Sequence, residues 1–329
     1  MRFSISLRPK DIRDYSSLKT QVDGQALERF KRLTEGGCIP LHLPAANRQK
    51  VAVEPGEGRG RVLPRLYLPE DIRLRADEIV AYENRKLEEA GIMGGWIDGG
   101  KLAVRSISVS VPDNRLSLGV SSLRWSEILA MGGLPFEEIA DYGALKLDTN
   151  THVLARHNDH DILLVGHRGR KPGEPRMGDI ALLAPAKENT QWTLATNGTV
   201  DADVMCSIPN PEDIWIANSL REFKEELGMD SHEKLSYLGL IVDPKMFVGA
   251  LGIVGVIETD LSPYEVDEAR KRAKYAVEVP VLDTIPLEKD TLATYLRVNR
   301  SNMVPQLVTS IVMLGYSRWG SGFLELADK

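Results

Sequence analysis

Three glutamates in one short segment are the residues of this chain whose types and spacing best suit chemistry. Glu222, Glu225 and Glu226 lie at spacings i, i+3 and i+4 within REFKEELGM (221–229), which places three carboxylates on one side of a helical turn. Like charges on adjacent turns destabilise a helix unless a counter-charge offsets the repulsion. The segment therefore predicts a cation site for Mg²⁺ or Mn²⁺, because hard divalent cations prefer carboxylate oxygens.

The neighbours of the three glutamates suit the same site. Arg221 can pair with one carboxylate and hold its rotamer, and Gly228 can end the helix in the left-handed conformation that suits glycine. A solvated acidic helix face is the usual explanation of an isolated Glu-x-x-Glu-Glu triplet. The complete string from Arg221 to Met229 favours function instead, because it should arise by chance at fewer than about one in a million positions at average residue usage.

This string resembles the second half of the Nudix box, whose full pattern is Gly, five residues, Glu, seven residues, then Arg-Glu-apolar-any-Glu-Glu-any-Gly-apolar. Every defined position of the second half is matched between Arg221 and Met229. The first half departs, because strict spacing places Ser207 at the glycine and Asp213 at the first glutamate. Another registration uses Gly198, in WTLATNGTVDAD, as the loop glycine and implies an insertion of roughly nine residues.

The resemblance implies hydrolysis of a diphosphate linkage in a nucleoside diphosphate derivative. Mg²⁺ or Mn²⁺ would be held by Glu222, Glu225 and Glu226, with Arg221 orienting the acidic cluster. An alternative is a catalytically weak or inactive Nudix-like module that binds a nucleotide-derived ligand and has a regulatory role. An isomerase or lyase on the same scaffold is a weaker third possibility, since fold does not fix function.

A further carboxylate commonly serves members of this family as general base or extra ligand, and no motif identifies it here. The candidates, each of which could also be a solvated surface residue, are Glu258, Glu265, Asp267, Glu268 and Glu278. We favour the segment 262–272. Positive charge for a substrate phosphate could come from Arg168, Arg170 and Lys171 in the loop 167–176, or that loop could be a solvated hairpin end.

Two other residue pairs carry weaker signals. His157 and His160 have no third metal ligand at a recognisable spacing, so turn polarity explains them better. Trp192 and Trp215 flank the box and could stack on a base. Aromatic core packing is nevertheless the commoner role at strand and helix-start positions.

The composition limits the class of protein and its partners. A net charge of −6 in 329 residues argues against bulk attraction to nucleic acid or to an anionic membrane surface. The longest apolar run, 246–257, is too short to span a bilayer, and the N-terminus lacks the apolar core of a signal peptide. Cys38 and Cys206 form no metal or disulfide pattern. We therefore expect a cytoplasmic protein with a small-molecule nucleoside diphosphate ligand. A homodimer is also an expectation, because many members of the resembled family are dimers.

The elements before the box segment predict a mixed α and β region. Residues 69–91 have the spacing and end signals of an amphipathic helix. Residues 102–111 alternate as a strand does, residues 115–120 follow across a turn, and Ser122 can cap a helix that begins near Leu123. We treat residues 1–147 as an N-terminal region of unknown role.

From about Asp148 the predicted order is strand, strand, strand, helix and strands. Residues 151–156 and 161–166 flank a turn and form a hairpin. The further expected elements are strands at 192–198, 235–243, 246–260 and 276–282 and a closing apolar helix at 302–315. The fold class is therefore α/β (α+β), a Nudix-like mixed sheet packed between helices. Residues 148–329 would form the catalytic domain with its C-terminal helix.

Overall fold

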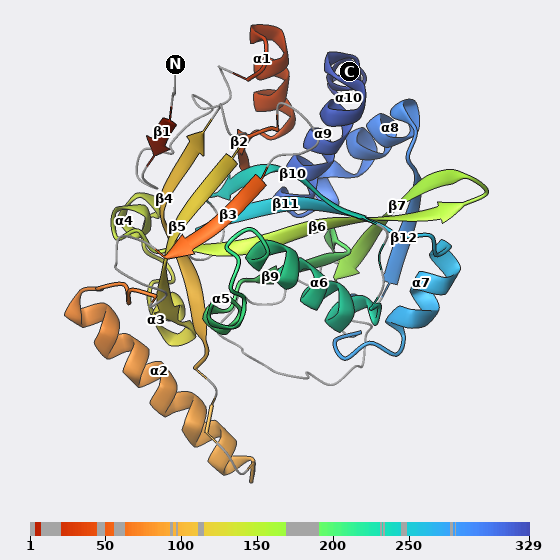
Figure 1. Ribbon diagram of the computed structural model, residues 1–329. Coiled ribbons are helices and arrows are strands. Elements are labelled where there is room, and N and C mark those ends of the chain that lie inside the picture. The colour runs from red at the N-terminus through yellow and green to blue at the C-terminus, as the bar shows by residue number, and fades with distance from the viewer. Residues whose placement is uncertain are drawn as a thin grey trace.

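The computed structural model describes residues 4–7, 21–44, 50–55, 63–92, 95–96, 98–110, 115–168, 191–230, 232, 234–244, 249–276, 279 and 281–329. Within these residues the fold is mixed α/β, as the sequence predicts. Helices pack on both faces of one mixed sheet (Figure 1). No helix of the described part is long and apolar enough to cross a membrane.

The sheet has a main path of strands with further strands attached. From one end to the other the path is β2 (Ile39–His42), β10 (Lys234–Asp243), β11 (Ala250–Glu258), β6 (Leu145–His157), β4 (Gly100–Ser110), β5 (Arg115–Arg124) and β3 (Lys50–Pro55). Attached to it are β1 (Ser4–Leu7) on β4, β9 (Thr196–Thr199) and β7 (His160–Arg168) on β6, and β8 (Gln191–Leu194) and β12 (Val281–Pro286) on β7. The β6–β11 and β3–β5 pairs are parallel.

The helices fall into groups around the sheet (Figure 1). One face is covered by α1 (Gly24–Leu33), α8 (Lys289–Asn299), α9 (Pro305–Trp319) and α10 (Ser321–Ala327), with the 3₁₀ turn η3 (Arg300–Asn302) before α9. The opposite face carries α5 (Ala202–Ser207), α6 (Ile214–Leu227) and α7 (Pro263–Arg270). The remaining helices, α2 (Glu70–Glu89), α3 (Trp125–Ala130) and α4 (Phe136–Asp141), pack at the β4–β5 end.

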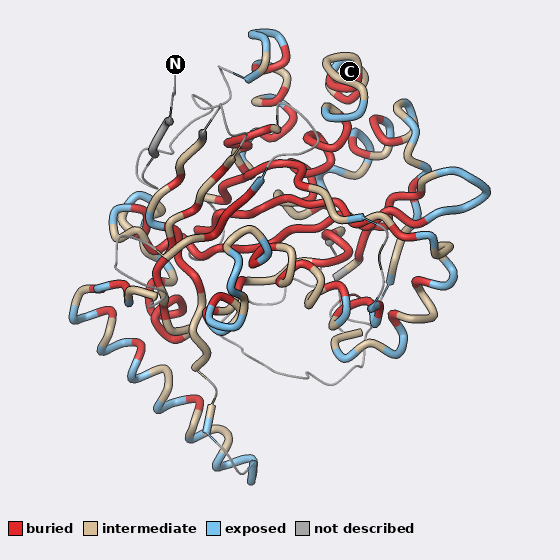
Figure 2. Tube along the Cα trace, in the orientation of Figure 1, coloured by how far each residue is buried: buried red, intermediate tan, exposed pale blue. Residues whose placement is uncertain are grey.

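Strand β6 is buried on both faces, because helices cover it from two sides. All of its residues from Leu145 to Ala155 are buried, and Figure 2 shows that burial is concentrated along the central strands. Successive strand side chains point to opposite faces. Leu154 belongs to the apolar cluster that contains α9, whereas Val153 belongs to the cluster that contains Phe223 of α6. Helices α6 and α9 therefore pack on opposite faces of β6.

The hairpin expected around residues 157–160 is confirmed. β6 and β7 pair up to the His157–His160 position. Asn158 and Asp159 between them have φ values of 49° and 64°, a conformation that Asn and Asp tolerate in two-residue hairpin turns. Both histidines are exposed at this tip, as turn polarity predicts.

The predicted cap at Ser122 is wrong. Ser122 lies within β5, opposite Leu102 of β4, so its backbone belongs to the strand ladder and cannot open a helix. The helix begins instead at Trp125. Glu127 accepts the Arg124 N–H at 2.8 Å there, and Asp98 accepts the Ser126 N–H at 2.7 Å.

Two C-terminal elements differ from their expected bounds. The strand expected at 276–282 runs from Val281 to Pro286, because these residues pair with β7; residues 277, 278 and 280 lie outside the described part. The closing helix begins at Pro305 rather than near residue 302 and continues to Trp319. Proline suits the first helical position because its missing N–H is not needed there.

The expected boundary between residues 147 and 148 falls inside β6. Strands β2 and β4 of the first region pair with β10 and β6 of the second. One apolar cluster contains Val104 from the first region and Leu251 from the second. The division into two regions stays a prediction from the sequence pattern. The sheet and its apolar core are continuous across the boundary.

Candidate functional site

Helix α6 carries the predicted carboxylate turn and ends where the sequence places its end. Phe223 and Leu227 are buried against the sheet, which turns the acidic side of the helix toward β9 and α7. Gly228 follows with φ 68° and donates its N–H to Lys224 O at 2.9 Å, as a left-handed glycine does at a helix end. A Cβ at Gly228 would lie 2.5 Å from Ala269 O, so the close approach of α7 also requires glycine.

Polar contacts join α6 to the strands beneath it. Asn218 donates from Nδ2 to Thr149 Oγ1 of β6 at 2.8 Å. In β6 itself, the buried ammonium of Lys146 pairs with Asp148 at 2.5 Å and reaches Thr199 Oγ1 of β9 at 3.4 Å. Buried polar groups need such partners, and these contacts hold β6, β9 and α6 in one arrangement.

Glu222 lies directly against the backbone of Gly198 in β9. A Cβ built on Gly198 would stand 2.2 Å from both Cδ and Oε1 of Glu222, so any other residue at position 198 would push this carboxylate out of its present place. The contact supports the registration that uses Gly198 as the loop glycine. Ser207, the strict-spacing alternative, is the last residue of α5.

Arg221 connects several acceptors around the turn. Its Nη2 donates to Glu222 Oε1 at 2.6 Å and to Asn218 Oδ1 at 2.9 Å, and its Nη1 lies 2.8 Å from Asp201 Oδ2. A planar guanidinium can bridge acceptors in this way. These contacts suit the orienting role expected of Arg221.

Glu225 faces two cations. Lys274 Nζ, from the turn after α7, donates to Glu225 Oε1 at 2.9 Å, and Arg221 Nη1 lies 3.7 Å from Glu225 Oε2. The Tyr275 N–H also donates to the backbone carbonyl of Glu225 at 2.8 Å. Hydrogen bonds to Tyr275 and Glu225 raise the pKa of Lys274, so this lysine is an ammonium at neutral pH.

Glu226 is the buried member of the turn. The residue is only 1% exposed, and its Oε2 accepts the Asn197 N–H of β9 at 3.0 Å. A buried carboxylate needs such a donor. Glu226 therefore holds β9 and its Gly198 against α6.

The carboxylates have the chemistry of metal ligands, but they are not arranged around a common metal position. Carboxylate oxygens are the ligands that Mg²⁺ and Mn²⁺ prefer. Among the described residues, however, no three His, Cys, Asp or Glu side chains are grouped so that they could hold a metal. Glu222 turns to Arg221, Glu225 to Lys274, and Glu226 to a backbone N–H. In this arrangement the residues do not fit a metal ion, and internal donors take the place that a cation would have.

Residues that no sequence spacing predicted also reach the site. Asp201 follows the loop glycine by three positions and pairs with both Arg221 and Lys101 of β4. Lys101 Nζ lies 5.7 Å from the ring centroid of Trp125. The N-terminal region therefore contacts the site through Lys101, which arrives there by strand pairing rather than by any local motif.

The described candidates for the further carboxylate all have partners of their own. These are Lys234 for Glu258 at 3.1 Å, Ser262 for Glu265 at 2.8 Å, Arg270 for Asp267 at 2.8 Å and Lys271 for Glu268 at 2.6 Å; Glu278 lies outside the described residues. The favoured segment 262–272 does approach α6, because Ala269 O faces Gly228. The identity of a general base stays open among them.

The remaining sequence candidates lie away from these contacts or outside the described part. Arg168 is the last residue of β7 and pairs with Gln191 of β8, whereas Arg170 and Lys171 are not among the described residues. Trp215 is buried and packs edge-to-face on Tyr237, which is the core role. Trp192 packs on His167, with ring centroids 4.4 Å apart.

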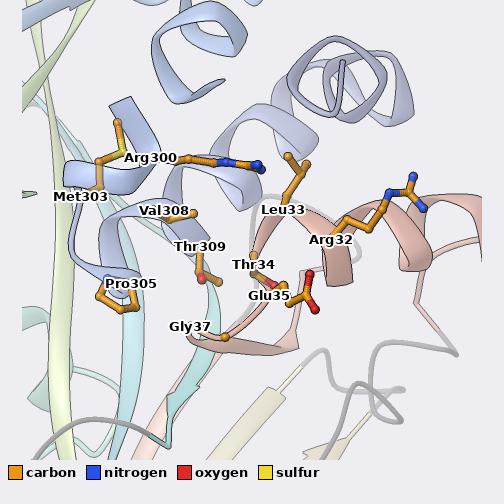
Figure 3. A pocket seen from close by; sticks show the side chains of 11 residues that line it. Arg32, Leu33, Thr34, Glu35, Gly37, Arg300, Met303, Pro305, Val308 and Thr309 are labelled. Carbon is orange, nitrogen blue, oxygen red and sulfur yellow. The ribbon is translucent and has the colours of Figure 1, made fainter. Parts of the chain in front are cut away.

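A cavity of about 420 Å³ lies on the other side of the molecule. Figure 3 shows its lining side chains, which come from the end of α1 and the segment after it, from η3 and its C-cap, and from the start of α9. Three of its polar side chains have internal partners: Arg32 pairs with Asp328, and the Thr34 and Thr309 hydroxyls donate to backbone carbonyls. This cavity gives no ligand assignment.

No protein-family model and no curated protein sequence matches the chain. Similar solved structures include the NUDIX domain of Shewanella oneidensis NrtR complexed with ADP ribose, with 12% identity over 51% of this chain and 86% of that chain and a TM-score of 0.30. A mutT/nudix family protein from Listeria innocua has 14% identity over 55% and 97% of the two chains, with a TM-score of 0.32. The apo form of T. brucei MERS1 has 12% identity over 38% and 42%, with a TM-score of 0.23. These distant likenesses carry no argument about activity.

Proposed function

We propose that the chain is a Nudix-type hydrolase that cleaves a diphosphate linkage in a nucleoside diphosphate derivative at the carboxylate turn of α6. The observation that supports this most is the fit of Glu222 on Gly198, where a Cβ would stand 2.2 Å from the carboxylate. A loop glycine and a box glutamate that are 24 positions apart in sequence meet there. The complete string from Arg221 to Met229 adds the acids and the terminal glycine of the same motif.

The chain's own residues have positioning roles in this proposal. Arg221 holds Glu222 at 2.6 Å, and the Asn197 N–H holds Glu226 at 3.0 Å, so two carboxylates are fixed before any ligand arrives. If Mg²⁺ or Mn²⁺ replaced the internal donors, Glu222, Glu225 and Glu226 would be its ligands, and it would supply charge neutralisation at the phosphates. A protein forms few covalent bonds in phosphoryl transfer, so fixing the catalytic groups in place beforehand is its main contribution to the rate.

The test is turnover with and without Mn²⁺ on nucleotide sugars, dinucleoside polyphosphates, ADP-ribose, NAD and nucleoside triphosphates. We expect Glu225→Gln to lower metal-dependent turnover by at least about 100-fold with the fold intact. The matched control is Glu28→Gln, because Glu28 is a surface acid of α1 that pairs with Lys31 and lies away from α6. A Glu225→Gln protein with near-full metal-dependent activity would remove Glu225 from the mechanism.

A second candidate is a Nudix-like module that binds a nucleotide-derived ligand without turnover. It is favoured by the lack of any grouped metal-ligand set in the described part of the chain. The same panel separates the two, because tight binding without phosphate-containing products selects the module. Product identification also separates hydrolysis from an isomerase or lyase reaction.

A further inference from the structure

We propose that Lys274 is a tethered counter-ion that occupies Glu225 and competes with a divalent cation for the carboxylate turn of α6. The inference rests on the proposed function, since it concerns the same carboxylates. It explains why three carboxylates whose chemistry suits a hard divalent cation are arranged around internal donors instead.

The first argument is the position of the Lys274 charge. Lys274 Nζ lies 2.9 Å from Glu225 Oε1, while Oε2 of the same carboxylate faces Arg221 at 3.7 Å. Both oxygens of Glu225 thus face positive groups. A divalent cation that used this carboxylate would have to replace Lys274 or accept the repulsion of an ammonium beside it.

The second argument is that backbone contacts, rather than the lysine side chain, hold the segment of Lys274 beside α6. The backbone N–H of Tyr275 donates to Glu225 O at 2.8 Å, and Ala269 O lies 2.5 Å from the position that a Gly228 Cβ would take. These backbone contacts hold the turn after α7 beside α6. The ammonium is therefore delivered to Glu225 at high effective concentration and can leave without unfolding the turn.

The third argument is the difference between the two cations at Glu225. The Lys274 side chain is 62% exposed and, besides Glu225, lies 4.5 Å from the Tyr275 ring centroid. The Arg221 side chain is 33% exposed and contacts three further polar groups, those of Asp201, Glu222 and Asn218. Exposed ion pairs are weak and screened by salt. Lys274 is therefore the displaceable cation, and Arg221 stays in place.

The test measures Mn²⁺ binding to the full chain by electron paramagnetic resonance and calorimetry, without relying on activity. We expect Lys274→Met to lower the Mn²⁺ dissociation constant by about three- to tenfold, because one competing charge is removed. Lys31→Met is the control: Lys31 lies on α1 and pairs with Glu28, away from the carboxylate turn, so its constant should stay within about twofold of wild type. Lys274→Arg should behave as wild type.

The outcomes separate this inference from the proposed function. Unchanged or weaker Mn²⁺ binding by Lys274→Met would overturn the role of Lys274, even if wild type binds Mn²⁺ and turns over. Binding by Lys274→Met where wild type shows none would support it. If no variant binds Mn²⁺ alongside saturating nucleotide, both the inference and the metal-dependent function fail. Circular dichroism checks each fold, and Lys274→Gln repeats the test with a polar side chain.

Discussion

Charge pairing governs the candidate site at the scale of single residues. Neighbouring carboxylates on one helical turn repel each other, and here each has a different donor: Arg221 for Glu222, Lys274 for Glu225 and a backbone N–H for Glu226. These donors lower the cost of holding three acids together. They also define which contacts a bound cation would have to replace.

The space beside Gly198 gives the first prediction at this scale. We expect Gly198→Ala to lower turnover by at least about tenfold, because the new Cβ, 2.2 Å from the Glu222 carboxylate, would displace it. The free energy of unfolding should fall by no more than about 1.5 kcal/mol, because the end of a flexible side chain can change its rotamer. Urea unfolding and the turnover assay measure both effects. Gly99→Ala is the control, since a Cβ there meets nothing within 4 Å. An alanine at 198 without effect on either would contradict the close contact.

Two buried histidines predict a loss of stability in acid. Burial lowers the pKa of His42 and of His152 to about 4. The unfolded chain, with a histidine pKa near 6.5, then binds more protons, so the free energy of unfolding falls as pH decreases from 6.5 toward 4. Each histidine should remove about 2 kcal/mol at pH 5 relative to pH 8.

Urea unfolding at pH 8 and pH 5 checks this pH dependence. His152→Leu should lose about 2 kcal/mol less than wild type between the two pH values, because a leucine takes up no proton. The two proteins are compared by their change with pH, so any packing difference that is the same at both values cancels. An equal loss in wild type and variant would show that His152 does not resist protonation.

At the scale of elements, α6 is positioned by the elements around it rather than by its own sequence alone. β9 supplies Gly198 and Asn197, β6 supplies Thr149, and α7 approaches the end of α6 at Gly228. On β9, β6 and α7 each contacting atom belongs to the backbone or to a short side chain, which leaves these partners little freedom to shift. The carboxylate turn therefore depends on helix packing as much as on the motif.

The end of α6 gives a prediction at this scale. Gly228 and Gly91 have φ values of 68° and 69°, so alanine at either costs about 1 kcal/mol for the left-handed backbone. Only at Gly228 does the new Cβ also meet a neighbour, Ala269 O at 2.5 Å. We expect losses in the free energy of unfolding of about 1 kcal/mol for Gly91→Ala and about 2–4 kcal/mol for Gly228→Ala. Equal losses in the free energy of unfolding, measured with urea, would show that α7 moves away from the new Cβ at no energetic cost.

At the scale of the whole molecule, the two sequence regions share one sheet and one core. β2 and β4 pair with β10 and β6, and Phe30 of α1 packs in the same apolar cluster as Leu307 of α9. A strand that loses its neighbour exposes both unpaired backbone groups and apolar side chains. The N-terminal region thus contributes to the support of the site as well as touching it through Lys101.

A truncation tests this continuity. Residues 144–329 alone should lack a cooperative thermal transition by circular dichroism, because β6 and β10 lose their neighbours β4 and β2. Co-expression with residues 1–143 should restore the transition, since the missing strands and α1 return. A cooperative transition of the isolated fragment near that of the full chain would instead establish an independent domain.

Local sequence patterns anticipated several parts of this structure for identifiable reasons. The helix at 69–91, the hairpin at 151–166 and the glycine after α6 follow from side-chain period and from the backbone freedom of single residues. Ser122 was mispredicted because a serine before an apolar run suits both a strand and a helix start, and the ladder to β4 decided between them.

The sequence by itself determined the carboxylate turn, because spacing within one helix decides which side chains share a side. Only the tertiary structure decided what meets that turn: Gly198 comes from β9 and Lys274 from the segment after α7, while Lys101 of β4 reaches it through Asp201. Strand pairing and helix docking bring them together from distant positions, and no local period encodes such contacts. The balance between internal cations and a metal ion at Glu225 is therefore a property of the folded molecule.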